Sequence, residues 1–405
     1  MSTRAPTRIL LLLAGVAVTT VIVLLAYNVL GDDRSTPTER IARRAVAECR
    51  KKPESKRTEC FAALLKQRLG EAGAGEALAT LQAIAIRDPD VDRDGPVYAH
   101  GIGIELYQQD TVAGRSFSQC TMLFSSGCYH GVVQAYLEHR AVVDAATLAD
   151  LCRSFRGTAS QWMLFQCVHG MGHGLSMFYG HDLPRALVAC DLLSGEWDRE
   201  SCYGGAFMEN VMHATMPDHP ASVLAASHQH HSTFQPLDPK DLQYPCSIVG
   251  TQHQRACYLM QTSVMLYFNK GDIAGAARVC DQAPIGSRPT CYQSLGRDIT
   301  SYALRDPDKS LLYCLQGSAD YRGWCYVGVT KALVDWSAKP ATGLDFCGRV
   351  ARGRGWAECY RAVGEEVAAL SETNAERAAH CRGAGGAEAV RECRIGALLP
   401  ADPPP

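Results

Sequence analysis

The sequence lacks the positive charge that binding to nucleic acid requires. Its 40 lysines and arginines stand against 42 aspartates and glutamates, which gives a formal net charge of −2. Without a basic excess there is no electrostatic footprint for a phosphate backbone, so we expect no nucleic-acid partner. The sequence also lacks the bias of a disordered chain or a low-complexity fibre. Of its 405 residues, 47% are hydrophobic and 20% are charged, which is a globular composition.

Several short catalytic and metal-binding motifs are also missing. There is no C-x-x-C, which excludes the usual zinc-ribbon and thioredoxin readings. There is no H-E-x-x-H, no G-x-S-x-G and no G-x-x-x-x-G-K-[ST], so nothing indicates a common zinc protease, α/β-hydrolase or P-loop enzyme. No N-x-S/T sequence is present either, so nothing suggests N-glycosylation.

Cysteine is abundant and regularly placed. The 18 cysteines form nine successive close couples. An even number in regular couples, without metal-ligand spacing, predicts nine structural disulfides and therefore an oxidising compartment. Pairing within each couple is inferred from the repeat described below, because sequence alone does not fix connectivity. The couples are Cys49/Cys60, Cys120/Cys128, Cys152/Cys167, Cys190/Cys202, Cys246/Cys257, Cys280/Cys291, Cys314/Cys325, Cys347/Cys359 and Cys381/Cys393.

One uncharged, apolar segment lies near the N-terminus. Residues 9–30 are long enough as a helix to cross the roughly 30 Å hydrocarbon core of a bilayer. We expect an uncleaved transmembrane anchor rather than a signal peptide, because no A-x-A-like site follows. Five arginines follow the segment and two precede it, which by charge alone favours a cytoplasmic C-terminal domain. The cysteines argue the reverse, so we predict a cytoplasmic N-terminus (1–8) and a periplasmic or cell-surface domain.

The cysteine spacing predicts a repeat of paired helices. The first cysteines of the last five couples lie 34, 34, 33 and 34 residues apart, a period typical of αα-repeats. In each unit the first cysteine ends one helix and the second opens the next, so a disulfide can join the two. A cysteine-free unit, Glu76–Gln109, completes the period. We therefore predict an all-α solenoid of about ten helical hairpins.

The architecture resembles the cysteine-rich Sel1-like and tetratricopeptide solenoids, on period and cysteine placement rather than on their consensus residues. The resemblance covers most of residues 43–399 and implies a fold type, not an activity. The predicted organisation is a juxtamembrane linker (31–42), histidine-rich hairpins (43–213), a His- and Pro-rich inserted loop (214–244), plain hairpins (245–399) and a tail (400–405).

Histidine is concentrated in the N-terminal units. Twelve of the 13 histidines lie between His100 and His253. In five units the second cysteine is followed by tyrosine and then by a variable residue, a position that we call the slot: Gly204, Leu259, Gln293, Val327 and Arg361. In three N-terminal units the slot holds histidine followed by glycine, at His100, His130 and His169. Slots of adjacent helices lie side by side, so these imidazoles can converge on one ion.

Two further pairs extend this pattern. His169 and His173 share one helix face at i, i+4 spacing, as do Glu209 and His213. Glu209 and Glu105 each lie five residues after a slot position. We predict a site for a divalent transition metal (zinc, iron, copper or manganese), with Glu209 or Glu105 as a ligand or general base. The predicted ligands are His100, His130, His169, His173, Glu209 and His213.

Three functions remain open from the sequence. The first is a membrane-anchored metalloprotein, with oxidoreductase or hydrolase activity if it is an enzyme. The second is a non-enzymatic scaffold that binds a protein partner on its concave surface, with the histidines as packing or capping residues. The third is metal storage or delivery, with the cluster His228–His231 in the inserted loop as acceptor. No role is assigned to His139, His181, His219 and His253.

Overall fold

The structure, a computed structural model, describes residues 35–124, 126–140, 142–157, 161–215 and 232–401. Within these ranges the regular elements are helices and there is no strand, which confirms the all-α prediction. None of the described helices is long and apolar enough to cross a membrane. The predicted anchor, residues 9–30, lies outside the described residues and stays a prediction.

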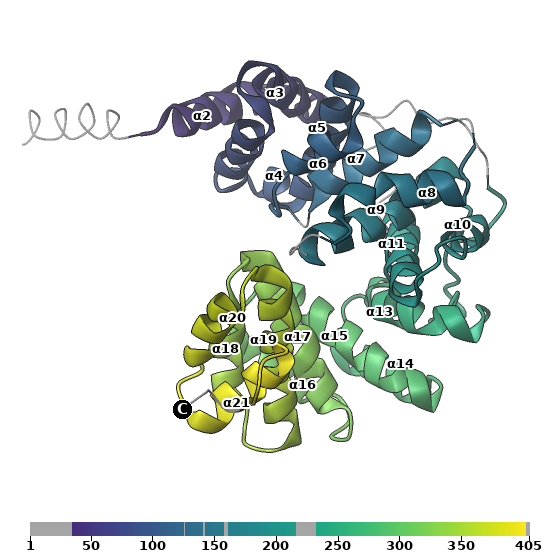
Figure 1. The fold of residues 1–405 in the computed structure, drawn as a ribbon, viewed down its shortest axis with the longest axis vertical. Helices are drawn as coiled ribbons and strands as arrows, with labels where there is room; N and C mark the ends of the chain where they lie inside the picture. Colours follow the sequence, from purple (N-terminus) through teal and green to yellow (C-terminus); the bar gives the residue numbers. More distant parts are fainter. Residues whose placement is uncertain (1–34, 125, 141, 158–160, 216–231, 402–405) are drawn as a thin grey trace, which may run out of the picture.

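Most hairpins pair a shorter first helix with a longer second helix (Figure 1). We call the first helix of every hairpin short and the second long, although α2 has 13 residues and α21 has 10. Each long helix packs against the next long helix, so together they form one continuous layer. The long helices are α3 (Glu54–Ala85), α5 (Gly95–Gln109), α7 (Gly127–Glu138), α9 (Gln161–Phe178), α11 (Glu196–Thr215), α13 (Thr251–Phe268), α15 (Arg288–Tyr302), α17 (Arg322–Ser337), α19 (Arg354–Leu370) and α21 (Ala387–Gly396).

The short helices carry the first cysteine of most couples. Aspartate caps the start of several of them, because its carboxylate accepts a hydrogen bond from a free amide of the first turn. The short helices are α2 (Pro37–Cys49), α4 (Pro89–Arg93), α6 (Ala113–Ser118), α8 (Ala145–Leu151), α10 (Leu183–Cys190), α14 (Ile273–Gln282), α16 (Pro307–Cys314), α18 (Pro340–Arg349) and α20 (Asn374–Arg382), with one-turn 3-10 helices at Arg153–Phe155 and Ile285–Ser287.

Two details differ from a simple hairpin repeat. Gly73, with φ of 82°, interrupts α3, so this element joins the second helix of the first hairpin to the cysteine-free unit. Cys246 does not end a helix as the repeat predicts but lies in a run of turns. Pro245 directly before it lacks the amide hydrogen that a helix interior uses, which explains the difference.

The nine cysteine couples form nine disulfides, each between the predicted neighbours, and no described cysteine is free. The Cα atoms of each pair lie 5.5–5.8 Å apart, which is ordinary disulfide geometry. Nine such bonds indicate that the protein folds in an oxidising compartment.

Glycines set the closest contacts between long helices. A Cβ atom on Gly131 of α7 would lie 2.0 Å from the carbonyl oxygen of His100 in α5, and one on Gly103 would lie 2.0 Å from that of Cys128. Only glycine fits at such a distance, so these helices touch backbone to backbone. The same paired contact joins α9 to α11, α15 to α17 and α19 to α21, through Gly172 and Gly205, Gly296 and Gly328, and Gly364 and Gly396.

Helix α13 stands outside this alternation. Where the long helices α5–α11 and α15–α21 place a glycine, one or three residues after the slot, α13 carries Met260 and Thr262. The Thr262 hydroxyl instead shares a hydrogen bond with the Ser294 hydroxyl of α15, at 2.6 Å. The array therefore consists of two blocks of glycine-joined pairs, α5–α11 and α15–α21, on either side of α13.

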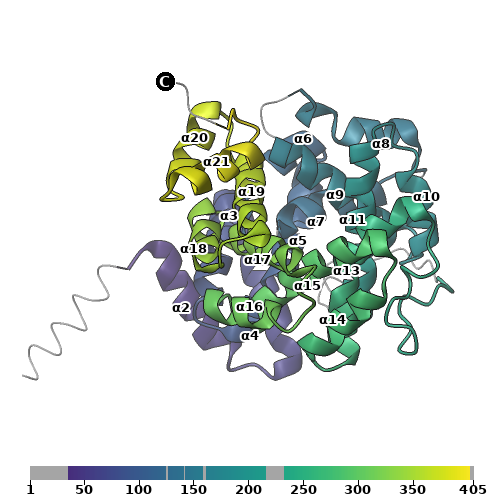
Figure 2. The same cartoon turned by 90° about the horizontal axis from the view of Figure 1, so that it is seen from below.

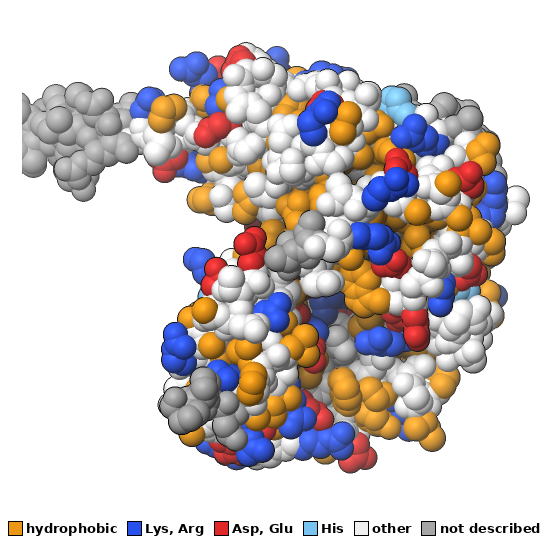
Figure 3. Space-filling model, viewed as in Figure 1, with side chains coloured by type: hydrophobic (Ala, Val, Ile, Leu, Met, Phe, Trp, Pro, Cys, Tyr) orange, Lys and Arg blue, Asp and Glu red, His pale blue; other side chains and the backbone are white. Residues whose placement is uncertain are grey.

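The array bends into an arc, as Figures 1 and 2 show. The C-terminal end of α19 reaches back to the beginning of α9, where Trp162 and Leu370 line a cavity of about 100 Å³. Figure 3 shows the surface hollowed between helices α2–α4 at one end and α18–α20 at the other. The arc places the histidine-bearing helices α7, α9 and α11 in one block and the plain helices in the other.

Candidate metal centre

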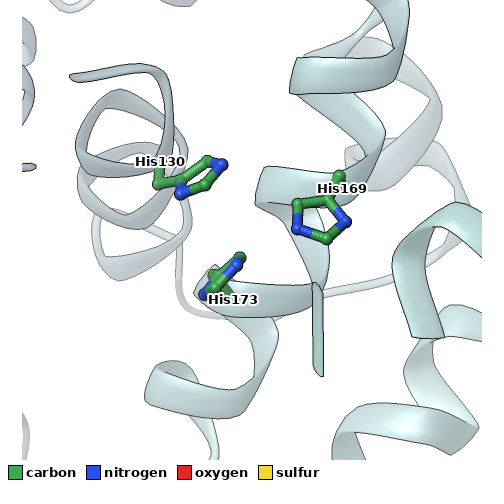
Figure 4. A group of neighbouring side chains, drawn as sticks. All are labelled: His130, His169 and His173. Carbon is green, nitrogen blue, oxygen red and sulfur yellow. The ribbon is translucent and has the colours of Figure 1, made fainter. Parts of the chain in front are cut away.

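Three histidines from two adjacent helices converge in the N-terminal block (Figure 4). His130 occupies the slot of α7 and His169 the slot of α9, and His173 follows one turn later on the same face of α9. One ligand nitrogen of each ring lies within 4.8 Å of the others. Gly170 makes room for this approach, since a Cβ atom there would lie 3.3 Å from the Cδ2 atom of His130.

The dimensions of the cluster suit a single metal ion. A tetrahedral ion with metal–nitrogen bonds near 2.0–2.1 Å needs its nitrogens about 3.4 Å apart, so ligation requires each ring to move inward by less than about 1 Å. The Nε2 atoms of His130 and His173 are buried and have no hydrogen-bond partner among the described residues. A buried polar atom without a partner is costly, and an ion between these rings would satisfy both.

Burial keeps the imidazoles of His130 and His169 neutral, which is the form that binds metals. Burial, together with the neighbouring histidines His173, His169 and His100, lowers the pKa of His130 well below its ordinary value. Burial, with a smaller contribution from His173, lowers the pKa of His169 to about 3. The lone pairs of both rings are therefore available at neutral pH.

A second set of hydrogen bonds holds the rings from outside. The Nδ1 atom of His173 lies 3.0 Å from Oε2 of the buried Glu209 carboxylate, and the other oxygen of Glu209 lies 3.2 Å from Nε2 of His181. Burial raises the pKa of the Glu209 carboxyl, but the hydrogen bonds from His173 and His181 outweigh it, so its pKa lies below the ordinary value. The backbone of Ser201 in α11 partly offsets the lowering of the His169 pKa. Protein metal sites use such partners to fix which ring nitrogen faces the ion.

The pairing of Glu209 with His173 is one case of a contact that recurs along the array. A carboxylate five residues after the slot of one long helix meets the residue four after the slot of the preceding long helix. In other pairs of helices this contact is an ordinary ion pair or hydrogen bond. In α9 the partner is the histidine His173, so the contact that joins the two helices also orients a predicted metal ligand. The equivalent pairs are Lys66 with Glu105, Ser263 with Asp298 and Lys331 with Glu366.

The remaining predicted site residues lie outside the three-histidine cluster. Glu105 pairs with Lys66 of α3, and both oxygens of Glu209 face histidine rings, so neither carboxylate is in the cluster. Nε2 of His100 is hydrogen-bonded to the side-chain oxygen of Gln134 at 2.5 Å, and His100 does not belong to the three-histidine cluster. His213 is exposed at the end of α11 and stacks on His181. The cluster His228–His231 lies outside the described residues.

Sequence reasoning missed two residues around the site: His181, which is hydrogen-bonded to Glu209, and Gln134, which is hydrogen-bonded to His100. His181 follows α9 in the connection to α10, and nothing in the spacing of the slot histidines points to it. His181 could have been found only by asking which polar residues near the end of α9 lie opposite Glu209 in the repeat.

We expect acid to destabilise the metal-free protein through these histidines. The pKa of His169 is about 3 in the folded state and near 6.5 when unfolded, so between these values only the unfolded chain binds the proton. The stability that His169 contributes is complete above pH 6.5 and declines as the pH falls towards 3. From pH 6.5 to 4.5 the loss is roughly 2 kcal/mol for this residue.

Denaturant unfolding at several pH values, with a chelator present, measures this loss. His169→Gln should flatten the pH dependence between 6.5 and 4.5 by about the same amount. An unchanged slope in that variant would show that His169 is not kept neutral by the fold.

Comparisons with known protein families, curated proteins and solved structures find no match to this chain. The resemblance to Sel1-like and tetratricopeptide solenoids therefore rests on the helical-repeat architecture alone. Function has to be argued from the site itself.

Proposed function

We propose that the protein is an extracytoplasmic metal-binding protein, anchored to a membrane by residues 9–30, whose metal centre is built from His130, His169 and His173. One observation carries the proposal: three buried imidazoles converge with one ligand nitrogen of each within 4.8 Å of the others, and the buried Nε2 atoms of His130 and His173 have no hydrogen-bond partner among the described residues. The nine disulfides support the extracytoplasmic part, because they require an oxidising compartment.

The donor set favours zinc or copper over manganese. Neutral imidazole nitrogen suits zinc, copper and iron, whereas manganese prefers carboxylate oxygen and water. The carboxylate nearest to the cluster, Glu209, faces the outer side of His173 rather than the three ligand nitrogens. Thiolates play no part, since the described cysteines are all in disulfides. A three-histidine ion with an open fourth position polarises a bound ligand or activates water, which is the chemistry of a hydrolase or an oxidoreductase.

The burial of the cluster favours a resident ion over storage or delivery. Each of the three histidines is at least nine-tenths buried, and the outer hydrogen bond to Glu209 fixes the orientation of His173. A transfer protein needs ligands that a partner can reach, and such ligands are more exposed. The scaffold alternative, with a protein partner on the concave surface, predicts no metal and is separated from this proposal by experiment.

The decisive experiment is metal analysis of the purified outer domain, residues 35–405, by elemental analysis and by zinc titration after chelation. We expect about one zinc ion per chain for a single three-histidine site. His130→Ala, His169→Ala and His173→Ala should each weaken zinc binding at least 100-fold, more than loss of an outer hydrogen-bond partner.

The array contains its own controls. Gln293 and Val327 occupy the slot in the plain block, in helices with the same glycine contacts as α5 and α7. Gln293→Ala and Val327→Ala should leave zinc affinity unchanged. A protein that binds neither zinc nor copper after careful loading, or equal losses at both sets of slots, would favour the scaffold instead.

A further inference from the structure

His181 lies on the turn that ends α9, at the outer edge of the metal centre. Its backbone is left-handed, with φ of 63°, directly after Gly180 with φ of 65°. This turn is closed by a hydrogen bond from the His181 amide to the carbonyl oxygen of Ser176, at 2.7 Å. The turn carries the imidazole back over α11, where it meets Glu209 and stacks on His213 with ring centroids 3.6 Å apart.

The plain block contains the same turn without a metal centre. Arg305 follows the slot of α15 by twelve residues, as His181 follows that of α9. It also has a left-handed backbone, with φ of 66°, and its amide bonds the carbonyl oxygen of Thr300 at 2.8 Å. Its guanidinium lies 4.2 Å from the ring centroid of Trp336, which occupies the register position of His213. The turn and the stacking are therefore scaffold.

What distinguishes His181 from Arg305 is its hydrogen bond to a buried carboxylate. Nε2 of His181 lies 3.2 Å from one oxygen of Glu209, while the other oxygen holds Nδ1 of His173 at 3.0 Å. At the register position of Glu209, the helix after Arg305 carries Ala332. The hydrogen bond is thus specific to the block that contains the histidine cluster.

We propose that His181 is a positioning residue of the metal centre, which fixes the Glu209 carboxylate that in turn orients His173. The inference rests on the proposed function. A carboxylate held at one oxygen only can rotate about its last bond, and Nδ1 of His173 then loses a fixed acceptor. With both oxygens held, Glu209 keeps the proton of His173 on Nδ1 and leaves the Nε2 lone pair facing His130 and His169.

The test compares zinc affinity and the visible spectrum of the cobalt-loaded protein across four variants. Loss of a direct outer partner costs 10- to 100-fold in metal affinity, so Glu209→Ala should fall in that range and His181→Ala should cost about tenfold. His181→Gln retains an N–H donor and should recover most of the affinity. Arg305→Ala, the matched change in the plain block, should leave affinity and spectrum unchanged.

The cobalt spectrum reports the ligand field, which a purely structural role for the turn would not alter. We expect shifted cobalt bands in His181→Ala and native bands in His181→Gln, with both proteins folded. His213→Ala, which removes the ring stacked on His181, should bind zinc within about twofold of the wild type. Two results would overturn this inference but not the proposed function. One is native zinc affinity in His181→Ala while Glu209→Ala binds more weakly, and the other is an equal loss of zinc affinity in His181→Ala and His181→Gln. A wild type that binds neither zinc nor cobalt would overturn the proposed function as well.

Discussion

Reduction of the nine disulfides is expected to unfold the helical array. Each bridge closes a segment of 8–15 residues, and a disulfide over such a loop stabilises by roughly 3 kcal/mol. Nine of them together exceed the 5–15 kcal/mol that separates most folded domains from their unfolded state. Short helices such as α6 and α8 have little core of their own and depend on these bridges to stay docked.

Circular dichroism during thermal unfolding, with and without a phosphine reductant, measures this effect. We expect a loss of the cooperative transition on reduction, with the helical signal falling at ambient temperature. Alkylation of the unreduced, denatured protein is the control and should label no more than trace thiol, since the described cysteines are all bridged. A reduced protein that melts at the native temperature would mean that helix packing alone holds the array together.

The substitution Gly205→Ala is expected to weaken metal binding as well as destabilise the fold. A Cβ atom on Gly205 would lie 1.9 Å from the carbonyl oxygen of His169, so α9 and α11 must move apart. That movement separates His173 from Glu209, the two residues whose contact crosses this helix interface. We expect a loss of about 3 kcal/mol in the free energy of unfolding, as for overpacking at a site without flexible neighbours, and a zinc affinity lowered by about 10- to 100-fold, as in Glu209→Ala.

Gly328→Ala is the matched control, because the equivalent contact in the plain block is equally close. A Cβ atom there would lie 1.9 Å from the carbonyl oxygen of Gln293. This variant should lose comparable stability in chemical denaturation and retain zinc. If both variants lose zinc at temperatures where they remain folded, the two blocks are coupled and the centre is not local to α7–α11.

The disulfides and the repeat follow from the sequence because cysteine spacing is a one-dimensional signal. A couple such as Cys280/Cys291 flanks a turn, and neighbours along the chain are neighbours in space. The convergence of His130 with His169 also follows, since slots of parallel helices lie side by side. The sequence does not show which of the slot histidines converge. His100 and His169 occupy the slot of different helices, but His100 is hydrogen-bonded to Gln134 and lies outside the cluster.

Glu105 and Glu209 show why the rest of the site could not be predicted without the structure. Glu105 and Glu209 occupy the same register and both pair with the preceding long helix, yet one meets Lys66 and the other His173. The register predicts that each carboxylate contacts the preceding long helix, but not whether its partner is a metal ligand. That depends on the residue type one helix earlier.

The alternation of glycine contacts bears on how such an array can change its length. In a glycine-joined pair the first helix carries glycine three residues after its slot, and the second helix carries it one residue after its slot. The repeating unit is therefore two hairpins. Insertion or deletion of a single hairpin would bring together helices whose glycines do not match. Helix α13 is such an odd unit, and hydroxyl groups at Thr262 and Ser294 fill the mismatch. Engineered arrays built from these repeats should therefore grow in steps of two.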